Sequence, residues 1–372
     1  MQVKRFARPA VEALETRWAP ALLLTLDSGG NLTGIFGVPD GDVTVTFTAD
    51  DTVNIDEDVN DLGTYVVSGG TLTVNIGNTT EALTHTINLG AFDLSGDLRV
   101  TLGNSSDVTT LDITGTAAAA IEGNLRVVTG NGEEEITLSA LTVEGSAYFK
   151  SQGSVDALLL DGAKIRGNLT VADVQDFEFD SGSLLDGNLS FSSRTENRAT
   201  AIDLDGDILG LASINTGNAN DVVNVRGTIN SHAIFKLANG TNNLDFFSSA
   251  VILGDVVVQT GSGNDDVDFL AAIIGGRITL TTGAGNDDVS FTGTEVLGSA
   301  ITYVAGNGND VLTITGLSAP GARLIFQGQN GNDNVTFAGA IDLLSAYLDG
   351  GFGLNNFTGG PVGFPITLRN FV

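Results

Sequence analysis

Short stretches in which apolar and polar residues alternate follow one another along most of the chain. The segment 277–299 is representative, because Ile278 and Leu280 alternate with polar residues and Val289 and Phe291 do so again a few positions later. A period of two over such short stretches predicts β-strands with one buried face. Glycine-rich corners separate the stretches, and no apolar period of 3.6 residues continues across them, so helices are not expected.

One corner sequence recurs four times at a spacing of 22 to 23 residues. It contains Gly-Asn-Asp, and its central glycines are Gly263, Gly285, Gly308 and Gly331. A fixed period in this range is typical of stacked repeat architectures. Each unit offers two longer strands and a short third one, which is the geometry of one coil of a parallel β-helix.

Weaker copies extend the repeat in both directions, at 239–244, 216–223, 129–136 and 351–357. Rungs in between carry a second marker, Gly-Asn-Leu, at 123–125, 167–169 and 187–189. We therefore expect an all-β fold, a right-handed parallel β-helix with coils of about 22 residues. Twelve or so coils, stacked ~4.8 Å apart, would form a rod on the order of 55–60 Å long.

The repeat also suggests how the chain is divided. Residues 96–358 are predicted to form the β-helix, and residues 22–95, which are rich in strands but lack the register, a β-rich cap over its open amino-terminal end. Residues 359–372 contain two prolines and are predicted to cap the other end. Residues 1–21 are predicted to be a leader or targeting segment.

Composition narrows the classes of function. With 45 acidic and 16 basic residues the net charge is −29, which disfavours binding to nucleic acid and favours cations. There is no cysteine, and the two histidines, His85 and His232, lie far apart in sequence, so zinc sites and histidine-activated nucleophiles are not expected. No stretch approaches the ~20 apolar residues of a spanning helix, and no transmembrane span is predicted.

The segment 8–20 resembles the leader "R-P-x-L-E-x-L-E-x-R-x-x-P" of predicted surface proteins of planctomycete bacteria. The matching positions are Arg8, Pro9, Leu14, Glu15, Arg17 and Pro20. The resemblance implies export to the cell envelope or the extracellular space. The alternative interpretation of this segment is an ordinary amphipathic amino-terminal helix.

The Gly-Asn-Asp corners resemble the hemolysin-type calcium-binding (RTX) nonapeptide. Its aspartate is matched by Asp265, Asp287, Asp310 and Asp333, and its central glycine by Gly263, Gly285, Gly308 and Gly331. The resemblance implies a Ca²⁺ site built from corner carbonyl and carboxylate oxygens. The family repeats its motif every nine residues, whereas here it occurs once per 22 or 23, so any cage must form between stacked coils.

A second interpretation of the same aspartates needs no metal. Asp and Asn side chains cap many turns by hydrogen bonding to nearby backbone, and Asp266 and Asp288 would then point to solvent. In the calcium interpretation, by contrast, the stacked carboxylates would repel one another, and divalent cations would relieve this repulsion. Both interpretations stay open on sequence grounds, and calcium is the cofactor that the resemblance implies.

For function, the repeat and the leader favour a non-enzymatic structural or adhesive rod, outside the cell or in its envelope. Its partners would be a cell-envelope protein or a polysaccharide. The alternative is a carbohydrate-active β-helix enzyme, such as a polysaccharide lyase or hydrolase. Its acids and bases would be sought among Asp173, Asp176, Glu178, Asp180, Arg194, Glu196 and Arg198. With one Trp and four Tyr, sugar-stacking aromatics are scarce, and no catalytic residue is assigned.

Overall fold

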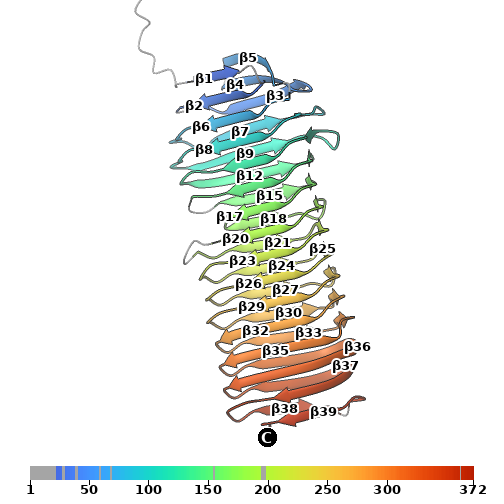
Figure 1. Cartoon of the computed structure of the whole chain (residues 1–372). Helices are drawn as coiled ribbons and strands as arrows, with labels where there is room; N and C mark the ends of the chain where they lie inside the picture. Colours follow the sequence, from blue (N-terminus) through green and yellow to red (C-terminus); the bar gives the residue numbers. More distant parts are fainter. Residues whose placement is uncertain are drawn as a thin grey trace, which may run out of the picture.

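The computed structural model describes residues 22–26, 30–37, 41–57, 60–67, 69–153, 156–193, 198–360 and 362–372. Within these ranges all regular elements are strands, and stacked parallel coils form a β-solenoid of about 13 turns with a coil length near 23 residues. Figure 1 shows the coils stacked in one column from the amino-terminal to the carboxy-terminal strands. The fold class predicted from the repeat is thus confirmed. The predicted leader, 1–21, lies outside the described residues.

Three parallel ladders run along the rod. The first contains β2 (Leu32–Phe36), β6 (Leu72–Ile76), β8 (Leu98–Leu102), β11 (Leu125–Val128), β14 (Ala147–Lys150), β17 (Leu169–Ala172), β20 (Leu189–Ser192), β23 (Ala212–Asn215), β26 (Ala233–Lys236), β29 (Val256–Gln259), β32 (Ile278–Ala284), β35 (Ala300–Asn307) and, last, β39 (Ile366–Arg369). The second contains β3 (Val43–Ala49), β7 (Leu83–Asn88), β9 (Val108–Thr114), β12 (Glu133–Ser139), β15 (Ala157–Asp161), β18 (Asp176–Phe179), β21 (Ala201–Leu204), β24 (Val222–Val225), β27 (Asn243–Phe246), β30 (Asp266–Leu270), β33 (Asp288–Thr292) and, last, β38 (Asn356–Gly359).

The third ladder is built from two-residue strands. It contains β10 (Ala120–Ile121), β13 (Thr142–Val143), β16 (Lys164–Ile165), β19 (Leu184–Leu185), β22 (Asp207–Ile208), β25 (Thr228–Ile229), β28 (Val251–Ile252), β31 (Ile273–Ile274) and β34 (Glu295–Val296). Near the carboxy-terminal end, the long strands β36 (Val311–Asn330) and β37 (Asn334–Asp349) pass through all three ladders.

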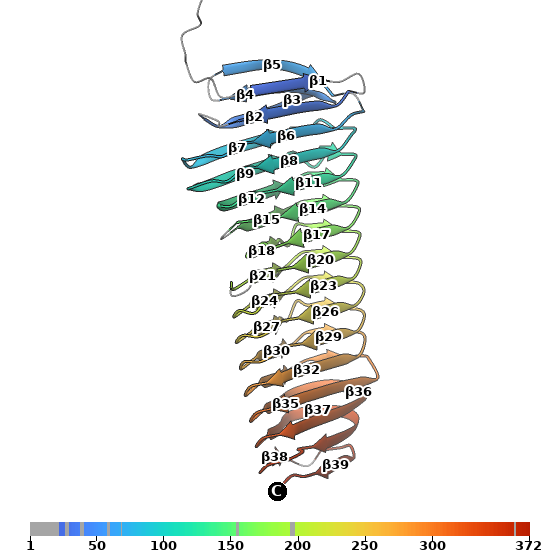
Figure 2. The ribbon, with the colours of Figure 1, turned by 60° about the vertical axis from the view of Figure 1, so that its left-hand side comes forward.

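Parallel stacking begins earlier than the sequence repeat does. β2 pairs in parallel with β6 and β3 with β7, so coils already form inside the segment 22–95. Leu32 pairs with Leu72 and Leu72 with Leu98, and these longer steps hide the period of 22. Among the described strands, β1 (Leu22–Leu26), β4 (Thr52–Glu57) and β5 (Asn60–Val66) make antiparallel pairs alone, β1 with β2 and β4 with both β3 and β5. They form the cover seen in Figure 2.

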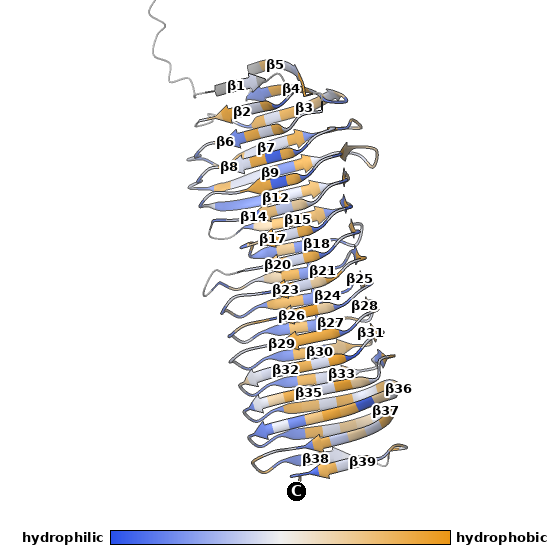
Figure 3. Cartoon of the chain, viewed as in Figure 1, coloured by the Kyte–Doolittle hydropathy of each residue, from blue (hydrophilic) through white to orange (hydrophobic). Residues whose placement is uncertain are grey.

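The interior is one continuous apolar core. Inward side chains of neighbouring coils stand in register, and Figure 3 shows apolar and polar positions alternating along the strands. Phe246, Phe269 and Phe291 form a parallel stack in the second ladder, with ring centroids 4.6 and 4.7 Å apart. At the carboxy-terminal end β39 adds a last strand on β37, within the predicted cap at 359–372.

Candidate functional site

The four predicted aspartates form a buried column at the corners between the first and second ladders. Asp265, Asp287, Asp310 and Asp333 are each at most 2% exposed. Oδ1 of each accepts a hydrogen bond from the backbone N–H of the corresponding residue one coil earlier, over 2.9–3.0 Å. The side chains therefore cap backbone, as the metal-free interpretation requires, but the backbone belongs to the neighbouring coil.

The preceding asparagines of the corners form a second, exposed column that runs in the opposite direction. Oδ1 of Asn264 accepts the N–H of Asn286, one coil later, over 2.8 Å. Asn286 and Asn309 repeat the contact at 2.8 and 2.9 Å. Each corner thus binds the coil before it through Asp and the coil after it through Asn. We name these sites the Gly-Asn-Asp corners.

Amide residues flank the run of four aspartates in this column. Oδ1 of Asn355 accepts the N–H of Asp333 over 2.7 Å at one end. At the other end Asn242 donates from Nδ2 to Oδ1 of Asp265 over 2.8 Å, and more weakly to the carbonyl oxygens of Ala238 and Gly240. At these positions a side-chain N–H group therefore faces acceptor oxygens.

Where aspartate replaces asparagine, an oxygen takes the place of that N–H group. A Cβ added at Gly328 would collide with Oδ2 of Asp333, just as one at Gly350 would collide with Nδ2 of Asn355. Oδ2 of each of the four aspartates is buried and lacks a hydrogen-bond partner. A buried carboxylate oxygen without a donor needs a proton or a cation.

The pKa values of the aspartates agree with a need for a proton or a cation at Oδ2. Burial raises the pKa of Asp310 to about 7; the N–H of Asp287 opposes the shift, and the charges of Asp287 and Asp333 add to it. Burial also raises the pKa of Asp265, Asp287 and Asp333. The next acids along the chain, Asp266 and Asp288, are exposed, as the capping interpretation predicted.

The oxygens of the column fit a hard cation such as Ca²⁺, which prefers carboxylate and carbonyl ligands. Each coil contributes one carboxylate, and within the described ranges no group of three His, Cys, Asp or Glu side chains is placed to hold a metal ion. Any cation here would depend on backbone oxygens and water for most of its shell.

The glycines at these corners are required by the stacking. Gly263, Gly285, Gly308 and Gly331 have φ between +136° and +150°, a region that favours glycine. A Cβ on each would collide with the carbonyl oxygen of the glycine one coil earlier. The resemblance to a glycine-rich motif thus reflects a steric need of this fold.

No family model, curated protein or solved structure matches this chain. The site must therefore be interpreted from its own geometry.

Sequence reasoning missed several members of the column. Asp221 accepts the N–H of Thr200 over 2.8 Å and also has a buried Oδ2 without a partner. Asn242 and Asn355 continue the column at the positions of the aspartates. The weaker repeat copies at 216–223, 239–244 and 351–357 contain all three, so alignment to the strong copies was the available signal.

The acids considered for an enzyme lie on a different surface. Asp176 and Glu178 are on the outward face of β18, in register with the following strands, where Asp203, Asp245 and Asp268 continue the row of Glu178. Arg226 binds Asp203 and Asp205 at 3.0 and 3.2 Å. Arg198 donates to the carbonyl of Gly153, and Arg194 and Glu196 lie outside the described residues.

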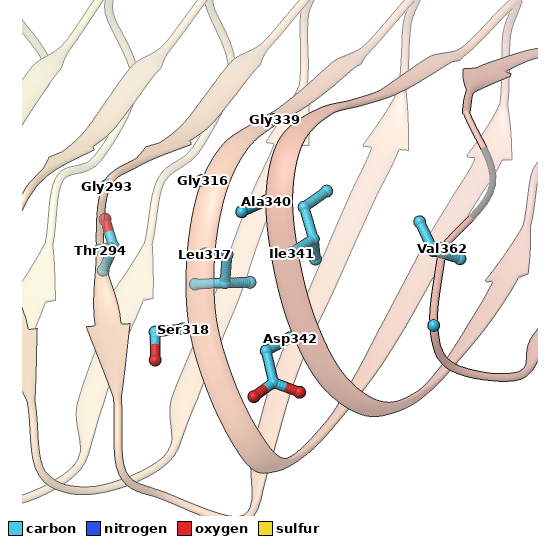
Figure 4. Close-up of a pocket in the computed structure, with 11 residues that line it drawn as sticks. Gly293, Thr294, Gly316, Leu317, Ser318, Gly339, Ala340, Ile341, Asp342 and Val362 are labelled. Carbon is cyan, nitrogen blue, oxygen red and sulfur yellow. The ribbon is translucent and has the colours of Figure 1, made fainter.

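A groove of about 610 Å³ lies elsewhere, on the third side of the last coils. Gly293, Gly316 and Gly339 form its corner row, and Val362 borders it from the carboxy-terminal segment (Figure 4). Its polar groups are Thr294, Ser318 and Asp342. Thr294 already donates to the backbone carbonyl of Phe269. Among the described residues that line the groove, Asp342 is the one ionisable side chain.

Replacing a corner glycine tests the steric argument. Gly308→Ala should lower the free energy of unfolding by about 2–3 kcal/mol, because the residue has φ +147° and its Cβ would strike the carbonyl oxygen of Gly285. Urea unfolding followed by circular dichroism measures the change. Gly321→Ala is the control, since a Cβ there meets nothing within 4 Å. Equal stability of the two variants would refute the argument.

Proposed function

We propose that this protein is a non-enzymatic structural rod of the cell envelope or the extracellular space. The observation that carries the proposal is the pair of opposed corner columns, in which Asp265 binds backwards and Asn264 forwards along the rod. The parallel ladders and the continuous apolar core add to it. A solenoid whose Gly-Asn-Asp corners hydrogen bond to the coils on both sides is suited to keeping a fixed length under load.

Calcium is proposed as the stabilising ion of the Gly-Asn-Asp corners. The support is the row of buried Oδ2 atoms in Asp265, Asp287, Asp310 and Asp333, which have no hydrogen-bond partner. A divalent cation there would supply positive charge where the folded chain has buried negative charge. The residues that would hold it are these four aspartates, with carbonyl oxygens of their corners.

The acidic exterior bears on possible partners. None of the described elements is a helix that could cross a lipid bilayer. With a net charge of −29, the rod would bind a cationic or neutral envelope component rather than nucleic acid. An envelope protein or a polysaccharide fits this description.

Cell fractionation of a bacterial host tests the proposal. The full chain should be recovered with the envelope or the medium, whereas a variant without residues 1–21 should remain in the cytosol. Recovery of both forms in the cytosol would contradict the assignment. The purified protein should release no soluble fragments from acidic or neutral polysaccharides. Release that is lost in Asp203→Asn would instead support the carbohydrate-enzyme alternative.

A further inference from the structure

A second buried acidic site lies near the amino-terminal end of the rod, away from the Gly-Asn-Asp corners. Glu134 in β12 is fully buried, as is Asp156 in the next coil. Glu134 is in register with the corner aspartates, because Gly132 occupies the central glycine position of its repeat copy. This copy reads Gly-Asn-Gly-Glu-Glu, so the aspartate is replaced by a longer acid.

The carboxylate oxygens of Asp156 accept hydrogen bonds, whereas those of Glu134 do not. Oδ1 of Asp156 accepts the N–H of Glu134 over 2.9 Å, and Oδ2 accepts the hydroxyl of Thr129 over 3.3 Å. Both carboxylate oxygens of Glu134 are buried without a hydrogen-bond partner. The hydroxyl protons beside it are used elsewhere, since Thr129 donates to Asp156 and Ser105 donates to the carbonyl of Asp107.

Oxygen atoms from three consecutive coils converge at this point. A Cβ at Gly132 would collide with both Oγ of Ser105 and Oε1 of Glu134. One at Gly153 would collide with the carbonyl oxygen of Gly132 and come close to Oδ1 of Asp156. The hydroxyl oxygen of Ser105, carboxylate oxygens of Glu134 and Asp156 and the carbonyl oxygen of Gly132 thus gather around these two glycines. These are the ligand types of hard cations.

One proton would not satisfy this arrangement. A proton shared between Glu134 and Asp156 would pair a single oxygen of Glu134 and leave the other buried without a donor. A cation can contact both oxygens at once. The pair differs in this respect from the Gly-Asn-Asp corners, where each carboxylate already has one satisfied oxygen.

We propose that Glu134 and Asp156, with the Ser105 and Thr129 oxygens beside them, form a separate binding site for a hard divalent cation of the calcium type. The site joins three coils where the sequence repeat is weakest. It is independent of calcium at the Gly-Asn-Asp corners, which lie more than a hundred residues further along the chain.

Without the metal, burial favours the protonated form of Glu134. Burial and, after it, the neighbouring Asp156 carboxyl together raise the pKa of Glu134 to about 8. Metal binding should therefore release protons and strengthen as the pH rises.

Hydrogen exchange of the full chain, read by mass spectrometry at pH 8, tests the site locally. Exchange in β12 and β15 should slow by about tenfold when free calcium is raised from an EDTA baseline to roughly ten times the dissociation constant. Glu134→Gln should abolish the slowing. Glu135→Gln, on the exposed face of the same strand, should retain it.

The glutamine variant is expected to fold. Gln175 lies one coil after Asp156 in the same row of side chains and shows that this row accommodates an amide. Its side chain accepts the N–H of Asp156 over 2.8 Å and donates to the carbonyl of Asp173. Equal exchange of wild type and Glu134→Gln in EDTA checks this point. Calcium-insensitive exchange of β12 in the wild type would overturn the proposal in favour of a shared proton, as would an unchanged response in Glu134→Gln.

Exchange in β30 and β33 reports separately on the Gly-Asn-Asp corners. A response there without one in β12 would refute this site alone.

Discussion

Chelation of calcium with EDTA at pH 8 should lower the thermal midpoint of the full chain by roughly 10 °C or more. Each occupied corner contributes ~2.7 kcal/mol when free calcium is a hundredfold above its dissociation constant. Asp265, Asp287, Asp310 and Asp333 supply four neighbouring carboxylates. At this pH Asp310 is above its pKa of about 7, so without metal its buried charge has no counter-ion.

The same experiment at pH 5 should give a much smaller effect of EDTA. An acid whose pKa is raised by folding stabilises the fold below its unfolded pKa, and this contribution is lost as the pH rises through the folded pKa. For Asp310 the window runs from 3.8 to about 7. The metal-free rod should therefore become less stable across that window, whereas stabilisation by calcium should increase.

Two variants separate the site from general ion effects. Asp310→Asn copies the amides of Asn242 and Asn355 and should keep the hydrogen bond to the Asp287 N–H, but should reduce both the calcium shift and the pH dependence. Asp288→Asn removes an exposed charge from the same coils and should leave the calcium shift unchanged. Differential scanning calorimetry measures all arms, with Mg²⁺ as a further control. An EDTA effect of equal size at pH 5 and pH 8 would contradict a site at these carboxylates.

Phe269→Ala should destabilise the rod by about 3–5 kcal/mol. Phe269 is fully buried, and its ring stacks on Phe246 at 4.6 Å and on Phe291 at 4.7 Å. Truncation removes both ring contacts and leaves a cavity that flanking coils cannot fill, because their strands are fixed in the ladder.

The measurement is urea unfolding, with hydrogen exchange to show where the rod opens first. Opening should begin in β27, β30 and β33, since each coil of a solenoid depends on its neighbours. Leu297→Ala is the matched control, because Leu297 is apolar but 63% exposed, and it should cost less than about 0.5 kcal/mol. A similar loss in both variants would refute the central role of the stack.

The weakness of the sequence signal at the amino-terminal end has a physical origin. The hydrogen-bonding pattern of a parallel ladder depends on strands and not on the length of the connections between them. The hairpin formed by β4 and β5 lengthens the first coil to 40 residues, counted from Leu32 to Leu72, without disturbing the pairing of β2 with β6. A search for a fixed period cannot detect such coils.

The sequence by itself determined the fold class, the coil length and the positions of the corners. Alternation of period two specifies strands with one buried face, and glycines at a fixed spacing specify where the chain turns, both of which are local properties. The same spacing placed Asp265, Asp287, Asp310 and Asp333 in one column.

Only the tertiary structure decided which oxygen of each aspartate is satisfied and where the column ends. Oδ1 accepts an N–H from the coil before it, and Oδ2 is left without a donor, because the stacking of neighbouring corners sets both environments. It also brought Glu134 against Asp156, a contact between coils that differ in sequence. Contacts of this kind depend on register between coils, which no single repeat encodes.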